Sequence, residues 1–395
     1  MIFPLNIPKV ISDNKKCFVF CVFVIMSFTW LAVHWFLKNS NGLSLLGGDN
    51  DFNFYFSGWS WLLPGMRLFK DGYAEYPLLG IAYISWPKIF TNNFEIYSTL
   101  LRLSNLVLYV ISGYLIWALN KKFKNDDSNW WWWCLPSVLY FSLNRFDIFP
   151  VSLVLFSVWL MVFGNIKFGW LVYGLAVVAK IYPVLLLPLY LSMTPDWRKQ
   201  WSWLVFFLLP MVLIGLIGIV SVGWLAVIYP LLIQSSRNFE PGSLIYVLFG
   251  FSNLTISPQV VRFFSLLLVT ILPLIWLIST IRGKMKQLTS RDNLAVASLV
   301  LLFFIYFCHF YSPQWWLWVL PFLIFITPSK AWWMIFLYDV LNYLQIIFFM
   351  LTGRTSIEFQ VVVVLRSLVL CGLIWFVIYK VWLPSQGRAF KFLIY

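Results

Sequence analysis

The chain has 395 residues, of which 62% are hydrophobic, 21% aromatic and only 11% charged. Soluble domains carry about 25% charged residues and about 45–50% apolar ones, so this composition excludes a water-soluble enzyme. Apolar runs of about 20 residues, enough to cross a hydrocarbon core of about 30 Å, recur along the chain. They do not alternate between polar and apolar residues as the strands of a β-barrel would. The sequence therefore predicts an all-α polytopic membrane protein.

The basic residues indicate how the chain is oriented. The net charge is +14, and the excess lies in short polar loops between apolar runs. Such loops stay in the cytoplasm and attract anionic lipid, so this charge does not point to a nucleic-acid partner. The five cysteines lack metal-ligand spacing and there are only two histidines, which argues against a metal site built on either.

Ten apolar runs are candidates for membrane spans. The first, Cys17–Leu37, follows three lysines that keep the N-terminus in the cytoplasm. The other nine are Tyr97–Asn120, Trp130–Asn144, Asp147–Gly164, Trp201–Ser221, Val260–Thr280, Leu294–Phe310, Trp315–Thr327, Ala331–Leu351 and Gln360–Leu383. Between Gly169 and Met193, Lys180 and Pro183 interrupt an apolar stretch. A re-entrant pair of half-helices there keeps every basic loop on one side. We expect a bundle of about ten transmembrane helices plus re-entrant pieces.

We expect a single transmembrane domain over residues 1–395, with one long segment on the outer face. This first extracytoplasmic loop, residues 38–96, contains two amphipathic stretches, Phe52–Phe69 and Pro77–Phe90. Both have the aromatic content of helices that lie at the membrane interface. The cytoplasmic loops are too short for a nucleotide-binding domain, which argues against an enzyme that uses ATP or a nucleotide sugar in the cytoplasm.

Acidic residues are scarce, and Asp49, Asp51, Asp71 and Glu75 lie close together in the first outer loop. Asp49 and Asp51 follow a Gly-Gly turn and precede a run of aromatic residues. Two carboxylates at this spacing can share a divalent metal, or one can act as a general base whose proton affinity is raised by aromatic packing. A solvated loop followed by an interfacial helix explains the same pattern without any chemistry.

Charged residues also mark two later positions. Arg145 and Asp147 place a cation and an anion at one outer turn, where a structural ion pair between them is the simpler explanation. Lys180 lies inside an apolar stretch, and ionisable residues within a membrane are functional by default. These three residues are therefore candidates for a site.

Two positions in the second half of the chain complete the set. His309 lies at a late outer turn among several hydrogen-bonding residues, although a lone histidine is more often structural. Arg366 lies in the middle of the last apolar run and is expected to pair with another residue, for which Glu358 is the candidate.

Five short motifs follow one another from about residue 45 to about residue 325. They are Asp51-Phe52-x-x-Tyr55, Tyr76-Pro77-Leu78-Leu79, Asn144-x-x-Asp147, Ala179-Lys180-x-x-Pro183 and Tyr311-Ser312-Pro313-Gln314. In this order they resemble the GT-C superfamily of membrane glycosyltransferases, and most closely glycosyltransferase family 87, the polyprenyl-phosphate-mannose-dependent mannosyltransferases. One departure is Glu75-Tyr76-Pro77-Leu78, where the family usually has Tyr-Pro-Pro.

The resemblance implies a GT-C-like helical bundle in the plasma membrane with its active site on the extracytoplasmic face. Such an enzyme, a hexosyltransferase, moves mannose or another hexose from a polyprenyl-phosphate sugar to a hydroxyl of a lipid or glycan acceptor, with inversion. It makes Asp51 the base, with Asp49 as the substitute. It implies no cofactor, and a divalent ion at these two aspartates is the less favoured arrangement. The expected donor-phosphate or substrate-binding residues are Arg145, Lys180, His309, Tyr55, Tyr76, Asp147 and Gln314.

Two other classes of protein remain as alternatives. A transporter or flippase for a lipid or small solute tends to have matched broken helices in both halves, and the second half of this sequence has no counterpart to the break at Lys180. A non-catalytic subunit of an envelope-assembly complex would not need two acids among aromatic residues. Membrane lipid is an expected partner in every case, and nucleic acid in none.

Overall fold

A computed structural model describes residues 49–58, 75–124, 129–194, 197–237, 240–247, 257–281 and 290–382. The chain divides into two compact units, Met1–Gly47 and Gly48–Tyr395, and all of the described residues belong to the second. The predicted first span, Cys17–Leu37, lies outside the described residues. Every regular element in the described ranges is a helix, which confirms the prediction of an all-α protein.

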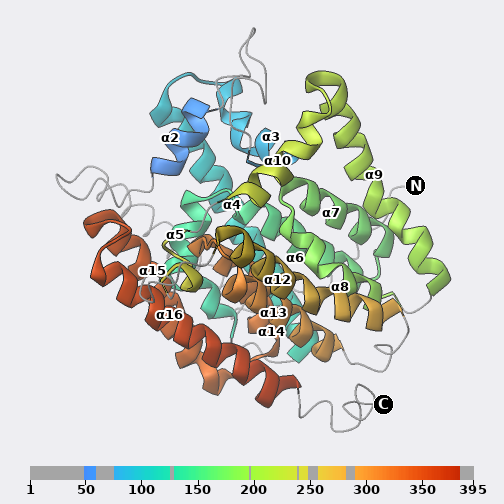
Figure 1. The fold of residues 1–395 in the computed structure, drawn as a ribbon. Helices are drawn as coiled ribbons and strands as arrows, with labels where there is room; N and C mark the ends of the chain where they lie inside the picture. The colour runs from blue at the N-terminus through green and yellow to red at the C-terminus, as the bar shows by residue number, and fades with distance from the viewer. Residues whose placement is uncertain are drawn as a thin grey trace, which may run out of the picture. The chain divides into compact units, whose positions relative to one another are not determined.

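The longer helices follow the predicted order along the chain (Figure 1). They are α2 (Asp49–Gly58), α3 (Leu78–Ser85), α4 (Phe94–Lys124), α5 (Pro136–Asn144), α6 (Ile148–Val162), α7 (Ile166–Ala179), α8 (Leu187–Ser192), α9 (Trp197–Val222), α10 (Leu225–Ser236), α12 (Pro258–Ile281), α13 (Ser290–Phe307), α14 (Trp316–Ile326), α15 (Trp332–Thr352) and α16 (Ile357–Phe376). Short 3-10 turns join several of them, at Trp86–Ile89, Trp130–Cys134, Tyr182–Leu186, Pro313–Trp315 and Ser329–Ala331, and a π-helical segment, Val377–Trp382, follows α16.

Five stretches of the described helices are long and apolar enough to cross a membrane. They are Phe94–Phe123, Ser202–Ser221, Gln259–Ile281, Trp332–Thr352 and Ile357–Tyr379, and the bent pair α5 and α6 makes a sixth if it counts as one span. Three further apolar helices are shorter, at Ile166–Ala179, Tyr182–Ser192 and Pro313–Ile326. The chain therefore has the character of a membrane protein, whereas the number of about ten spans remains a prediction.

The predicted span Trp130–Asn144 is not one helix. Pro136 begins α5, and the preceding Leu135 is extended, with φ −66° and ψ 152°. A residue before proline is pushed out of the helical region by the proline ring. The helix that remains has nine residues, which gives about 14 Å at 1.5 Å per residue. It then meets α6 at an angle of 107°, so α5 and α6 form a sharp corner.

The described parts of the two stretches predicted to be amphipathic contribute to a core. α2 packs against α4, and α3 packs against α7. Phe52 and Tyr55 of α2 join Ile81 and Ile84 of α3 in one buried cluster that also contains Phe146, at the corner between α5 and α6. Burial of these side chains ties α2 and α3 to the bundle, whereas their place at the membrane interface remains a prediction.

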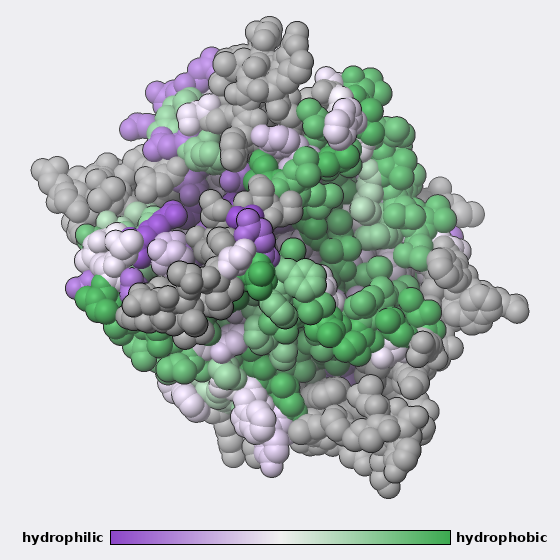
Figure 2. Space-filling view, viewed as in Figure 1, coloured by the Kyte–Doolittle hydropathy of each residue, from purple (hydrophilic) through white to green (hydrophobic). Residues whose placement is uncertain are grey.

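Other helices pack side by side with helices that are close to them in sequence. α6 contacts α7, α7 contacts α9, and α15 contacts α16 (Figure 1). Gly174 of α7 faces the backbone of Phe207 in α9, where any side chain would overlap the Phe207 carbonyl oxygen. The outer faces of α9 and α12 are hydrophobic, and hydrophilic residues gather in a hollow beside them (Figure 2). A hydrophobic outer surface is what contact with lipid requires.

Candidate functional site

A cavity of about 720 Å³ collects polar residues from segments far apart in the sequence. Six of the predicted site residues line it: Asp51, Tyr76, Arg145, Lys180, His309 and Gln314. Two others, Asp147 and Tyr55, lie behind its wall and contact residues that line it. For Asp49 the structure describes the backbone position at the start of α2. The cavity therefore brings together residues of four motifs, and from the fifth it contains Arg145, which lies between Asn144 and Asp147.

Helix α4 holds the corner between α5 and α6 in place. The side-chain amide of Asn105 donates hydrogen bonds to the carbonyl oxygens of Leu143, at 3.0 Å, and of Arg145, at 3.2 Å. Arg102, one turn earlier, donates to the side-chain oxygen of Asn144 at 3.2 Å. These bonds satisfy backbone groups that the bend frees from helical pairing, and they fix the direction in which Arg145 leaves the corner.

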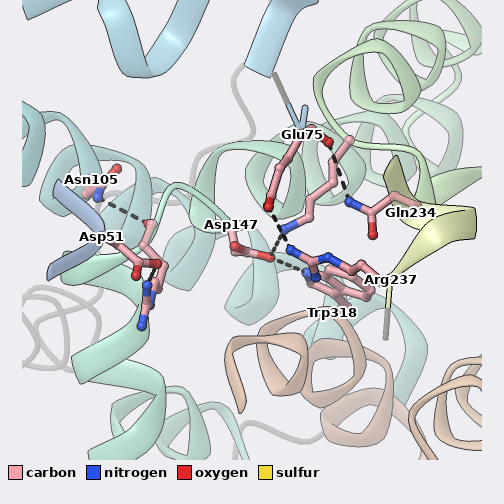
Figure 3. Close-up of polar contacts among 9 residues, drawn as sticks. Asp51, Glu75, Asn105, Asp147, Gln234, Arg237 and Trp318 are labelled. Carbon is pink, nitrogen blue, oxygen red and sulfur yellow. Dashed lines mark hydrogen bonds and ion pairs between the residues drawn. The ribbon is translucent and has the colours of Figure 1, made fainter. Parts of the chain in front are cut away.

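Asp51 and Arg145 form an ion pair in the cavity wall (Figure 3). The Asp51 side chain is 32% exposed and that of Arg145 is 14% exposed, so the carboxylate remains accessible from the cavity. The sequence predicts that aromatic neighbours raise the proton affinity of a carboxylate here, and the structure also places the Arg145 guanidinium against Asp51. Positions 49 and 51 differ by two residues along α2, and such positions do not face each other on a helix.

Asp147 pairs with Lys180, not with Arg145. The Lys180 ammonium lies 2.6 Å from Asp147 Oδ1, and the same oxygen accepts a hydrogen bond from Trp318 Nε1 at 2.9 Å (Figure 3). Asp147 is 1% exposed. The sequence predicts that Asp147 is an anion at the membrane surface. It offers an Arg145–Asp147 ion pair as the simpler explanation for the two charges at this turn. The sharp corner instead turns Asp147 inward, and the two residues serve different partners.

Lys180 reaches Asp147 because α7 ends just before it. Its backbone is extended, with φ −159° and ψ 143°, and the chain continues into the 3-10 turn Tyr182–Leu186. Its ammonium also lies 4.7 Å from the ring centre of Phe146 and 5.1 Å from that of Trp318, within cation–π range. Ion pairing and aromatic faces together offset the cost of burying the charge.

Helix α3 approaches this point closely. Gly80 of α3 lies against Ala179, and a Cβ atom at Gly80 would overlap the Ala179 carbonyl oxygen. Tyr76, just before α3, packs its ring 4.5 Å from that of Phe146 and 6.2 Å from that of Tyr55. Burial raises the pKa of Tyr76 well above its usual range, so the phenol is a neutral hydrogen-bonding group at the cavity wall.

The turn at His309–Gln314, between α13 and α14, forms another part of the cavity wall. His309 is buried, and its backbone N–H donates to the hydroxyl of Ser265 in α12 at 3.0 Å. The Ser265 hydroxyl also lies 3.3 Å from His309 Nδ1. Gln314 lies in the 3-10 turn Pro313–Trp315 and lines the cavity. These contacts place the second-half motif beside the residues of the first half.

The cavity also contains a charge cluster that the sequence did not identify. Arg237, the residue after α10, places Nη2 at 2.7 Å from Glu75 Oε2 and Nη1 at 3.8 Å from Glu240 Oε1. Burial raises the pKa of Glu240, although Arg237 and Arg354 oppose this. Glu75 is one of only 14 acidic residues in the chain. A search of the sequence for a cation to pair with each of these acids would have included Arg237.

No three His, Cys, Asp or Glu side chains in the described part of the chain are grouped as a metal site requires. Comparison with protein-family models and with curated protein sequences finds no match for this chain. The arrangement can therefore be judged only by its chemistry. It combines three carboxylates, three cations paired with them or with Asp147, and aromatic walls around one cavity in an apolar protein.

Proposed function

We propose that this protein is a membrane glycosyltransferase of the GT-C type. It moves a hexose from a polyprenyl-phosphate sugar to an acceptor hydroxyl on the extracytoplasmic side, with a bundle of about ten spans in the plasma membrane. The observation that carries the proposal is that motifs spread from Asp51 to Gln314 meet in one cavity. Independent structural roles would not require them to share a cavity.

The reaction is a single displacement. The acceptor oxygen attacks the anomeric carbon, its proton passes to the Asp51 carboxylate, and the bond from that carbon to the phosphate oxygen breaks. The electron pair of that bond leaves with the polyprenyl phosphate, and the anomeric centre inverts. Asp51 suits the role of base because it lines the cavity and about a third of its side chain is exposed, which leaves its carboxylate within reach of an acceptor hydroxyl.

The leaving phosphate gains negative charge, which nearby cations stabilise. Arg145 and Lys180 lie in the same wall, and His309 lies across the same cavity. Asp147 then serves as a positioning residue, since it holds Lys180 at 2.6 Å. The apolar helices around the cavity provide the surroundings that a polyprenyl tail requires.

The test uses membranes that contain the protein and polyprenyl-phosphate hexoses carrying a radiolabelled sugar. We expect the wild type to transfer label to an endogenous acceptor and to release polyprenyl phosphate. Asp51→Asn should abolish both while the protein still accumulates in the membrane. Glu95→Gln is the matched control, since Glu95 is an exposed acid in the first turn of α4. Full activity of Asp51→Asn would show that Asp51 is not the base.

One observation favours the alternative of a transporter or flippase. Lys180 is an ionisable residue at the end of an apolar helix, and transporters bind their substrates at such breaks. Proteoliposomes loaded with a fluorescent polyprenyl phosphate distinguish the two. Movement of the unmodified lipid across the bilayer, with no sugar transfer in the membrane assay, would support transport in place of transfer.

A further inference from the structure

Arg237 differs from the other cations of the cavity. It directs one edge of its guanidinium at Glu75 (Figure 3). Another edge points toward Glu240, and all three residues line the cavity. The Arg237 side chain is 25% exposed, against 14% for Arg145 and 13% for Lys180. Of these three paired cations, Arg237 is therefore the one that a molecule in the cavity reaches most easily.

Its present contacts leave much of its binding capacity unused. A guanidinium has five N–H donors, and among the described residues the Glu75 carboxylate receives one hydrogen bond from it, at 2.7 Å. The Glu240 oxygen is 3.8 Å away, beyond hydrogen-bond distance. A phosphate group offers more acceptor oxygens and more charge than one carboxylate, and it fits a guanidinium in a two-point arrangement.

The surroundings of Arg237 suit a phosphate attached to an apolar chain. Leu231, on the same helix α10, lines the cavity, as do Leu266 and Val269 of α12. Leu231 is 52% exposed and Leu266 is 48% exposed. An anionic head group at Arg237 would thus have apolar side chains beside it for a hydrocarbon tail.

We propose that Arg237 binds the phosphate group of a lipid phosphate, and that Glu75 occupies the guanidinium until the lipid displaces it. This inference rests on the proposed function, since it assigns the phosphate of that donor to a residue outside the motifs. Glu75 then acts as a competitor for the cation. Lys180 lies close enough to interact electrostatically with both Glu75 and Arg237, so the released phosphate meets a second cation.

Competition gives the two partners opposite effects. Removing the charge of Glu75 leaves Arg237 available and should tighten lipid-phosphate binding, whereas removing the charge of Arg237 should weaken it. A purely structural ion pair predicts that both changes weaken binding, because each leaves one partner without its counter-charge. The direction of the Glu75→Gln effect therefore decides between the two interpretations.

The experiment titrates farnesyl phosphate into the full-length protein in nanodiscs. Farnesol and inorganic phosphate are tested in parallel, to separate the tail from the phosphate. We expect Arg237→Gln to raise the Kd for farnesyl phosphate about tenfold or more, and Glu75→Gln to lower it about threefold to tenfold, where tenfold corresponds to about 1.4 kcal/mol. Farnesol should bind all variants equally. Glu95→Gln controls for the loss of one acid.

Unchanged or weaker binding by Glu75→Gln would overturn the proposal, even if Arg237→Gln fails to fold. Equal binding of farnesol and farnesyl phosphate to the wild type would overturn it as well, and inorganic phosphate binding as tightly as the lipid would show that the tail plays no part. If the wild type bound farnesyl phosphate tightly but transferred no sugar in the membrane assay, this inference would stand while the proposed function failed.

Discussion

Lys180 and Arg366 are buried cations near the same cavity, and the protein neutralises them in different ways. Lys180 contacts a carboxylate, Asp147, at 2.6 Å. Arg366, in the middle of α16 and 2% exposed, has no carboxylate within ion-pair distance among the described residues, and the expected partner Glu358 is exposed at the start of α16. Arg366 instead donates to Gln345 Oε1 and to the Gly242 carbonyl oxygen, and its guanidinium carbon lies 3.5 Å from the ring centre of Tyr311.

The groups that contact Arg366 belong to a hydrogen-bond network that joins α5, α15 and the turn at His309–Gln314. Tyr311 donates to Asn342 at 2.5 Å, and Asn342 donates to the Pro313 carbonyl oxygen at 2.9 Å. The network ends at the buried Asp339, which accepts hydrogen bonds from the backbone and the hydroxyl of Ser137. Its positive and negative charges are thus connected through several hydrogen bonds and do not touch.

The difference shows what each region can do. Gly242, Tyr311 and Gln345 all line the cavity, and a network of many mutually dependent bonds fixes such groups in one arrangement. Direct ion pairs such as those at Arg145 and Arg237 can exchange one anion for another. We infer that the network around Arg366 forms a rigid wall, whereas the direct ion pairs at Arg145 and Arg237 supply the charges that respond to a ligand.

The largest expected effect comes from breaking the buried ion pair. Asp147→Asn leaves the Lys180 ammonium in an apolar wall without its counter-charge, which should cost about 3–5 kcal/mol of stability. The measurement is the apparent melting temperature in one fixed detergent. The double variant Asp147→Asn/Lys180→Met removes both charges and should recover most of the loss. A single variant as stable as the wild type would mean that the charge of Lys180 is compensated elsewhere.

Much of the helical order could be predicted from the sequence, because apolar runs bounded by basic loops and prolines mark helices in any context. The predicted span Tyr97–Asn120 lies within α4. The predicted span Ala331–Leu351 almost coincides with α15. The sequence predicts a turn at Arg145 between the spans Trp130–Asn144 and Asp147–Gly164, but it does not give the direction of the corner between α5 and α6. Its geometry depends on Asn105 of another helix, which satisfies the freed carbonyl groups.

The candidate site was partly visible in the sequence for a similar reason. Scarce charges in an apolar chain stand out singly, so Asp51, Arg145, Asp147 and Lys180 could be selected. Their pairing could not, since it follows from the direction of the corner and from the close approach of α3 to the end of α7. Arg237 was missed because the segment after α10 has no motif. Its role becomes apparent only from its ion pair with Glu75.

The next prediction addresses the rigid wall. Arg366→Met leaves the oxygens of Gln345 and Gly242 without this donor, and an unsatisfied buried acceptor costs about 1–3 kcal/mol. The same change removes a buried guanidinium that has no carboxylate at contact distance, which offsets part of that cost. The melting temperature should therefore fall less than for Asp147→Asn. Arg366→Lys is the conservative variant, and it should recover part of the stability because its ammonium still donates to one or both oxygens. A loss larger than that of Asp147→Asn would reverse the comparison.

A smaller effect is expected where α3 meets α7. Gly80→Ala places a Cβ atom against the Ala179 carbonyl oxygen, and forcing an extra carbon into a packed contact costs about 1–3 kcal/mol. The displaced α3 should also weaken farnesyl phosphate binding, since Tyr76 and Lys180 flank the contact. Gly372→Ala in α16 is the matched control, because its new Cβ atom would be 3.5 Å from Met334 at an ordinary contact distance. Equal melting temperatures for the two variants would contradict this account of Gly80.

The smallest effect concerns the pH dependence of stability through Glu240. Burial raises the pKa of Glu240 above its ordinary value of 4.5 in the folded protein. The folded state therefore binds this proton more tightly than the unfolded chain, and stability falls as the pH rises from 4.5 toward the raised value. Glu240→Gln should match the wild type in melting temperature below that range and exceed it at neutral pH. Glu95→Gln controls for the loss of one negative charge. If the wild type and Glu240→Gln kept the same difference at every pH, the half-buried carboxyl would carry no such cost. The charges around Arg237 would then respond less to their surroundings than the comparison with Arg366 requires.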